Sequence, residues 1–76
     1  MSVRIHWRPA TDKGHSFEHG VSKNLDVLKR QFGSASLGRA HIPQLRAMAA
    51  AAEDSFYNEV ADIIEQVGAI EIWGEW

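Results

Sequence analysis

The chain has 76 residues, a formal net charge of −2 and no cysteine, and 45% of its residues are hydrophobic. A domain this small buries only about 60% of its unfolded surface, so we expect residues 1–76 to form a single compact domain with a modest core. The absence of cysteine excludes disulfides, thiolate metal sites and thiol nucleophiles, which favours either a cytoplasmic protein or a dimer that shares its core. No apolar run approaches the length of a membrane span.

The N-terminal segment alternates between apolar and polar residues. Val3, Ile5 and Trp7 alternate with Arg4, His6 and Arg8. This period of two predicts a half-buried strand, which Pro9 ends. A second strand over residues 13–19, hairpinned to the first, is the weaker prediction because Phe17 is its only strongly apolar residue.

A helical stripe follows. Its apolar residues recur at the spacing of one helix face: Val21, Leu25, Leu28 and Phe32. Ser22 is the expected N-cap, and Gly33 stands where a left-handed glycine ends a helix. Residues 33–41 are small and polar, which predicts a loop.

Residues 43–67 carry a second, longer helical pattern. Pro43 suits a first helical turn, and Gly68 ends the pattern. The apolar positions expected to face the core are Leu45, Met48, Ala49, Ala52, Phe56, Val60, Ile63, Ile64 and Val67. One unbroken helix would be about 37 Å long, too long for this domain, so we expect a break at Asp54-Ser55, where the aspartate offers a new N-cap.

The last segment, residues 69–73, alternates again. Ile70 and Ile72 are expected on the core, with Glu71 and Trp73 on the other face. Pairing with the N-terminal strand would place Glu71 on the side of the basic residues of that strand. The sequence therefore predicts an α+β fold: a small sheet of two or three strands, with the N-terminal and C-terminal strands paired, packed against two or three helices.

His15-Ser16-Phe17-Glu18-His19 matches H-x-x-E-H, a helical zinc motif of peptidases. Gly14 and Gly20 bracket it and disfavour a helix, and in a strand the two histidines would lie about 13 Å apart. A solvated loop is the favoured interpretation. We therefore predict no metal, no cofactor, no catalytic residues and no enzymatic activity.

Acidic residues gather on one side of the last helix. Glu59, Asp62 and Glu65 lie away from its apolar stripe, at 100° per residue. They form either a solvated face or a surface that docks a basic partner. Charge is also split along the chain: residues 1–38 carry six Lys/Arg and three Asp/Glu, whereas residues 39–76 carry two and seven. The two halves would either neutralise each other or meet different partners.

Tryptophans and acids end the chain. Trp73 is out of phase with the core, and Glu75 and Trp76 follow it. Exposed aromatic side chains beside charges are common protein-binding hot spots, so these three residues join the acidic face as the predicted partner-binding site. A terminal strand at a sheet edge could also pair with a second copy, which would make a homodimer.

A basic surface offers the alternative. Arg4, Arg8, Lys29 and Arg30 could contact phosphates, which would make the chain a nucleic-acid-binding accessory protein. Its acidic overall charge, and pairing of these residues with Glu71 and Glu75, argue against that alternative.

The C-terminal third resembles the ending of small phage and prophage proteins. The residues that carry the resemblance are Phe56-Tyr57-Asn58-Glu59, Ile63-Ile64-Glu65 and Gly68-Ala69-Ile70-Glu71-Ile72-Trp73-Gly74-Glu75. Chains of this type include the anti-CRISPR proteins, which are compact cytosolic inhibitors. The resemblance implies a protein partner, in particular a host nucleic-acid-targeting complex. We therefore expect a small non-enzymatic binding or inhibitor module.

Overall fold

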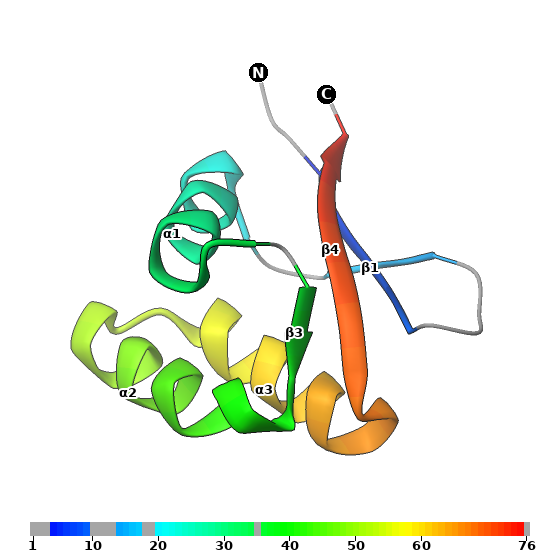
Figure 1. Cartoon of the computed structure of the whole chain (residues 1–76). Coiled ribbons are helices and arrows are strands. Elements are labelled where there is room, and N and C mark those ends of the chain that lie inside the picture. The colour runs from blue at the N-terminus through cyan, green and yellow to red at the C-terminus, as the bar shows by residue number, and fades with distance from the viewer. Residues whose placement is uncertain (1–3, 10–13, 18–19, 35, 76) are drawn as a thin grey trace.

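The computed structural model describes residues 4–9, 14–17, 20–34 and 36–75. Together they form an α+β fold in which three α-helices pack on a four-stranded antiparallel sheet of order β2-β1-β4-β3 (Figure 1). In chain order the elements are β1 (Arg4–Pro9), β2 (His15–Ser16), α1 (Ser22–Phe32), β3 (Ser36–Gly38), a 3-10 turn η1 (Arg39–His41), α2 (Ile42–Ala52), α3 (Ser55–Val67) and β4 (Ala69–Glu75). Within this described part, no helix has the length and apolarity needed to cross a membrane.

The N-terminal and C-terminal strands form the centre of the sheet, as predicted. β1 and β4 pair without interruption from Arg4 opposite Glu75 to Pro9 opposite Ile70. The expectation of two or three strands is wrong by one. β3 lies in the segment predicted to be a loop, because Leu37 pairs with Ile70 and buries all but 2% of its surface. One apolar residue in a small, polar segment gives no periodicity from which to predict a strand.

α1 occupies the predicted residues, but its start differs. Ser22 is the first helical residue and Val21 is the N-cap. The Val21 N–H donates to Asn24 Oδ1 at 2.7 Å, the bond that the third residue of a helix makes back to the N-cap in a capping box, while the Asn24 N–H donates to the Val21 carbonyl. At the other end Gly33 is left-handed (φ 73°) and its N–H donates to the Lys29 carbonyl, as predicted.

The second helical pattern breaks where the sequence indicated. α2 ends at Ala52, Glu53 adopts a left-handed conformation (φ 50°), and Asp54 caps α3 by accepting a hydrogen bond from the Phe56 N–H at 3.0 Å. Gly68 ends α3, as expected, with its N–H on the Ile64 carbonyl.

The helices all lie on one side of the sheet, and the core fills the space between (Figure 1). The buried hydrophobic residues come from both the sheet layer and the helix layer: Ile5, Phe17, Leu25, Leu28, Leu37, Leu45, Ala49, Phe56, Tyr57, Val60, Ala61, Ile64, Ile70 and Ile72. Three residues of the predicted stripes are exposed instead. Val21 is 55% exposed, Val67 is 40% exposed and Ala52 is exposed as well, because each lies at a helix end, where the neighbouring layer no longer covers it.

One polar side chain lies inside this core. Asn24 is only 2% exposed, and it links the start of α1 to the start of α3. Its amide nitrogen donates to Asp54 Oδ2 at 2.9 Å and to Tyr57 Oη at 3.2 Å, while its oxygen accepts the Val21 N–H. The hydrogen-bonding capacity of the amide is thus satisfied, as a buried polar group requires.

Candidate functional site

The sheet has a second face, which no helix of the described residues covers (Figure 1). We call it the outer face. Strand alternation places Ile5, Ile70 and Ile72 on the core side, so their neighbours in β1 and β4 occupy the outer face. The register sets His6 opposite Trp73 and Arg8 opposite Glu71. The prediction that Trp73 lies away from the core, on the side of the β1 basic residues, is confirmed.

Three flat side chains stack on this face. The rings of His6 and Trp73 have centroids 5.6 Å apart and planes inclined by 21°. The Arg8 guanidinium carbon lies 5.6 Å from the Trp73 ring centroid, a cation–π distance. We refer to His6, Trp73 and Arg8 together as the Trp73 stack.

Gly14 shows how the indole lies. A Cβ atom added to Gly14 would stand 2.7 Å from the Trp73 Cη2 atom and 3.9 Å from the Trp7 carbonyl oxygen. The indole of a β4 residue therefore reaches across β1, beside the backbone of Trp7, to the segment that leads into β2. His6 and Arg8, on either side of Trp7 in the chain, both contact this ring.

Two further contacts hold the ends of the stack. Arg8 Nη2 lies 3.2 and 3.3 Å from the two carboxylate oxygens of Glu71, and both side chains are 52% exposed. At the other end, Ser16 Oγ lies 3.0 Å from His6 Nδ1. An ion pair this exposed contributes little to stability. Its effect here is to fix the direction of the guanidinium.

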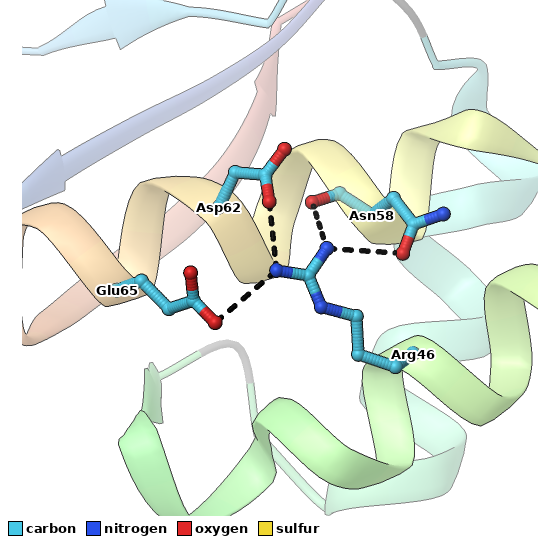
Figure 2. Close-up of polar contacts among 4 residues, drawn as sticks. All are labelled: Arg46, Asn58, Asp62 and Glu65. Atoms are coloured by element: carbon cyan, nitrogen blue, oxygen red, sulfur yellow. Dashed lines mark hydrogen bonds and ion pairs between the residues drawn. The ribbon is translucent and has the colours of Figure 1, made fainter.

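The acidic face predicted on α3 is partly engaged within the protein (Figure 2). From α2, Arg46 Nη2 binds Asp62 Oδ1 at 2.7 Å and Glu65 Oε1 at 3.2 Å, and its Nη1 lies 3.1 Å from Asn58 Oδ1. Hydrogen bonds to Asp62 and then Glu65 raise the pKa of Arg46 above its already high ordinary value. Asp62 and Glu65 thus join two helices, and Glu59 is half-buried on the same helix.

The remaining candidates are dispersed. The register pairs Arg4 with Glu75 at the end of the sheet, and Trp76 lies outside the described residues. Lys29 and Arg30 are exposed on α1, which packs on the core side of the sheet, whereas Arg8 lies on the outer face. The residues proposed for phosphate binding therefore do not share one surface.

The H-x-x-E-H motif is described only in part. His15 begins β2 and stacks on Trp7, with ring centroids 4.6 Å apart, while Glu18 and His19 lie outside the described residues. Across the portion that the structure describes, no group of three His, Asp or Glu side chains is placed to hold a metal ion.

Gly14 belongs to the site but was not predicted in it, and His6 was predicted only as part of the basic face of β1. The signal for His6 was present, since the expected pairing of the terminal strands puts it on the same face as Trp73. The contact of Gly14 with Trp73 depends on how far the indole reaches across a neighbouring strand, and no sequence pattern encodes that distance.

Comparison with known proteins assigns the chain to no family. No protein-family model, curated protein or solved structure matches the chain. The arrangement of side chains on its surface is therefore the basis on which a function is argued.

Proposed function

We propose that the chain is a small non-enzymatic protein-binding module that meets its partner with the Trp73 stack. The observation that carries the proposal is that Trp73, on the uncovered sheet face, is in contact with both His6 and Arg8. A half-exposed tryptophan held by two side chains of its own chain loses little side-chain freedom on binding.

The composition of this surface favours a protein partner. Tryptophan and arginine are the residue types most enriched at binding hot spots, and here they are in contact. The charges around them are balanced, because Arg8 is paired with Glu71. A balanced, aromatic-centred surface suits a protein interface better than a polyanion.

Nucleic-acid binding is less well supported by the same contacts. Base stacking needs an open aromatic ring, and the Trp73 indole is already in contact with His6 and Arg8 of its own chain. Phosphate binding needs a concentration of positive charge, and Arg8 is paired with Glu71. Lys29 and Arg30 belong to α1, the helix that packs on the core side of the sheet.

The acidic residues of α3 take a secondary place in the proposal. Asp62 and Glu65 are 60% and 55% exposed despite their contacts with Arg46, so they can reach a basic partner only in competition with that arginine. A host nucleic-acid-targeting complex, the partner class implied by the phage-protein resemblance, is the first partner that we would test.

The experiment compares three variants as bait for affinity capture from host cells. Gly14→Ala should displace the indole, because its new Cβ collides with the ring, while leaving the core untouched. Asp62→Asn/Glu65→Gln removes two charges with little change of shape and is the matched control. We expect Trp73→Ser and Gly14→Ala to lose a partner that the wild type captures and the control retains.

The reverse pattern would contradict the proposal. If capture survives both stack variants and fails with the control, the α3 surface is the interface. Charge reversal to lysine is the poorer test of α3, because it would also break the contacts that join α2 to α3 (Figure 2). Circular dichroism of each variant checks that it is folded.

A further inference from the structure

We propose that the outer face also binds a second copy of the chain, in a weak two-fold dimer whose axis runs parallel to the strands between β1 and β4. This inference rests on the proposed function, because it takes the same surface as the interface. It names one partner that this surface fits, and it follows from the order of charges on two neighbouring strands.

The outer face carries a positive charge on one strand beside a negative charge on the next. Among the residues whose side chains the structure describes, the outer positions are His6 and Arg8 in β1 and Glu71 and Trp73 in β4. The register sets Arg8 beside Glu71 and His6 beside Trp73. On this face β1 therefore carries the positive charge and β4 the negative charge.

A partner that complements this face must present the two charges in the opposite order. A second copy, turned face to face about an axis parallel to the strands, does so without any other change. The rotation places β1 of one copy over β4 of the other and keeps positions along the strands. Arg8 then lies over Glu71 of the second copy, and His6 lies over its Trp73.

Charge also selects this axis over the other two-fold axis in the plane of the sheet. An axis perpendicular to the strands would place β1 over β1 and β4 over β4, so the strand that carries Arg8 would face itself and the strand that carries Glu71 would face itself. Like charges that face each other across an interface are strongly unfavourable, whereas complementary charges fix the register. Face-to-face sheets pack about 10 Å apart, a distance that side chains of this length fill from both sides.

The size of the face sets the strength of the dimer. Six paired residues span about 20 Å, and four strands, of which the two outer ones are short, give roughly 300 Å² per copy. A stable interface buries at least about 1,200 Å² in total, roughly twice what two such faces provide. We therefore expect an association that is populated only at high protein concentration and that weakens with added salt.

A charge exchange tests the arrangement. Glu71→Arg alone places arginines opposite each other and should abolish the dimer. Arg8→Glu/Glu71→Arg exchanges the two charges, which preserves the pair within each copy and the complementarity between two exchanged copies. This double variant should dimerise with itself and should not associate with the wild type, since like charges then meet at both positions.

Self-association is measured by sedimentation equilibrium from about 0.01 to 1 mM, the range in which an interface below the standard size is populated. Mixing is followed by adding unlabelled double variant to 15N-labelled wild type and observing the Trp73 indole signal. A wild type that is monomeric throughout would overturn the dimer. Free mixing of wild type and double variant would overturn the proposed axis.

These outcomes are separable from failure of the proposed function. Capture of a different protein by the Trp73 stack uses bait far below dimerising concentrations, so it can succeed while the dimer fails. If the dimer forms as described and the capture fails, the outer face is an interface between copies only.

Discussion

Replacing Asn24 by alanine tests whether the buried amide joins α1 to α3. The side chain is 2% exposed and makes three hydrogen bonds, with Val21 N, Asp54 Oδ2 and Tyr57 Oη. Alanine removes all of them, including the buried bond to the Tyr57 hydroxyl. The two helices would then be held at this point by apolar contacts alone.

The expected cost follows from the partners. A hydrogen bond between neutral groups contributes about 1 kcal/mol, and one to a charged group about 1.5–3 kcal/mol. Two neutral bonds and one bond to the Asp54 carboxylate give a loss of about 3–5 kcal/mol in the free energy of unfolding. For a domain of this length, each kcal/mol lowers the Tm by about 6 °C, so Asn24→Ala should lower it by roughly 20 °C or more.

Urea unfolding followed by circular dichroism measures the loss directly. Tyr57→Phe is the matched control, because it removes only the acceptor at 3.2 Å and should cost about 1 kcal/mol. If Asn24→Ala costs no more than Tyr57→Phe, the amide does not join the helices and the reasoning is refuted. A double-mutant cycle of the two residues should show coupling, because they are in contact.

Three other outcomes follow from single contacts. Gly20→Ala should lower the free energy of unfolding by about 2–5 kcal/mol, because φ is +128° and the new Cβ would stand 2.7 Å from the buried Phe56 ring. Gly33→Ala should lower it by about 1–2 kcal/mol, because φ is +73° but no atom stands in the way. Equal losses in urea unfolding would refute this difference. The Gly38 N–H donates to His41 Nδ1 at 3.0 Å, so 15N NMR of the neutral imidazole should show the proton on Nε2, and a proton on Nδ1 would contradict that bond. At low salt Arg46→Gln should have a lower Tm than the wild type, and in about 1 M NaCl the two Tm values should converge, because salt screens the ion pairs. Tm values that still differ at high salt would show that the variant loses packing and not charge.

The elements with strong local signals were predictable from the sequence. The stripe from Leu25 to Phe32 gave α1, because helical periodicity and a terminal glycine agree. Asp54 gave the break between α2 and α3, since a capping residue satisfies N–H groups within its own turn. Pairing of β1 with β4 followed from charge alternation, and the contact between Arg8 and Glu71 confirms it.

The elements that depend on distant residues were not predictable in the same way. β3 owes its place to Leu37, whose burial is decided by Ile70 across the sheet and not by its own neighbours. The α1 cap is formed by Asn24, a residue that also has to meet Asp54 and Tyr57. A local pattern cannot show which of several polar residues will find buried partners.

The candidate site likewise has features that the sequence predicts and features that depend on how distant residues meet. The outward position of Trp73 follows from period-two alternation, which the sequence contains. That Arg46 binds Asp62 and Glu65 does not follow, because it depends on how α2 folds back along α3 (Figure 2). From the sequence we expected these acids to form an exposed surface, whereas in the fold both bind the Arg46 guanidinium.

The central position of β1 and β4 in the sheet has a consequence for the protein as it is synthesised. Arg8 and Glu71 are 63 residues apart in the chain. At about 5–20 residues per second, β1 is synthesised several seconds before β4, the strand with which it forms its longest pairing. During that time the edge of β1 that β4 will cover is open, although β2 follows β1 directly in the chain and pairs with its other edge. Arg4, Arg8 and Pro9 are the types of residue that act as gatekeepers at such segments, so the charges of the outer face also protect the strand before the sheet has formed.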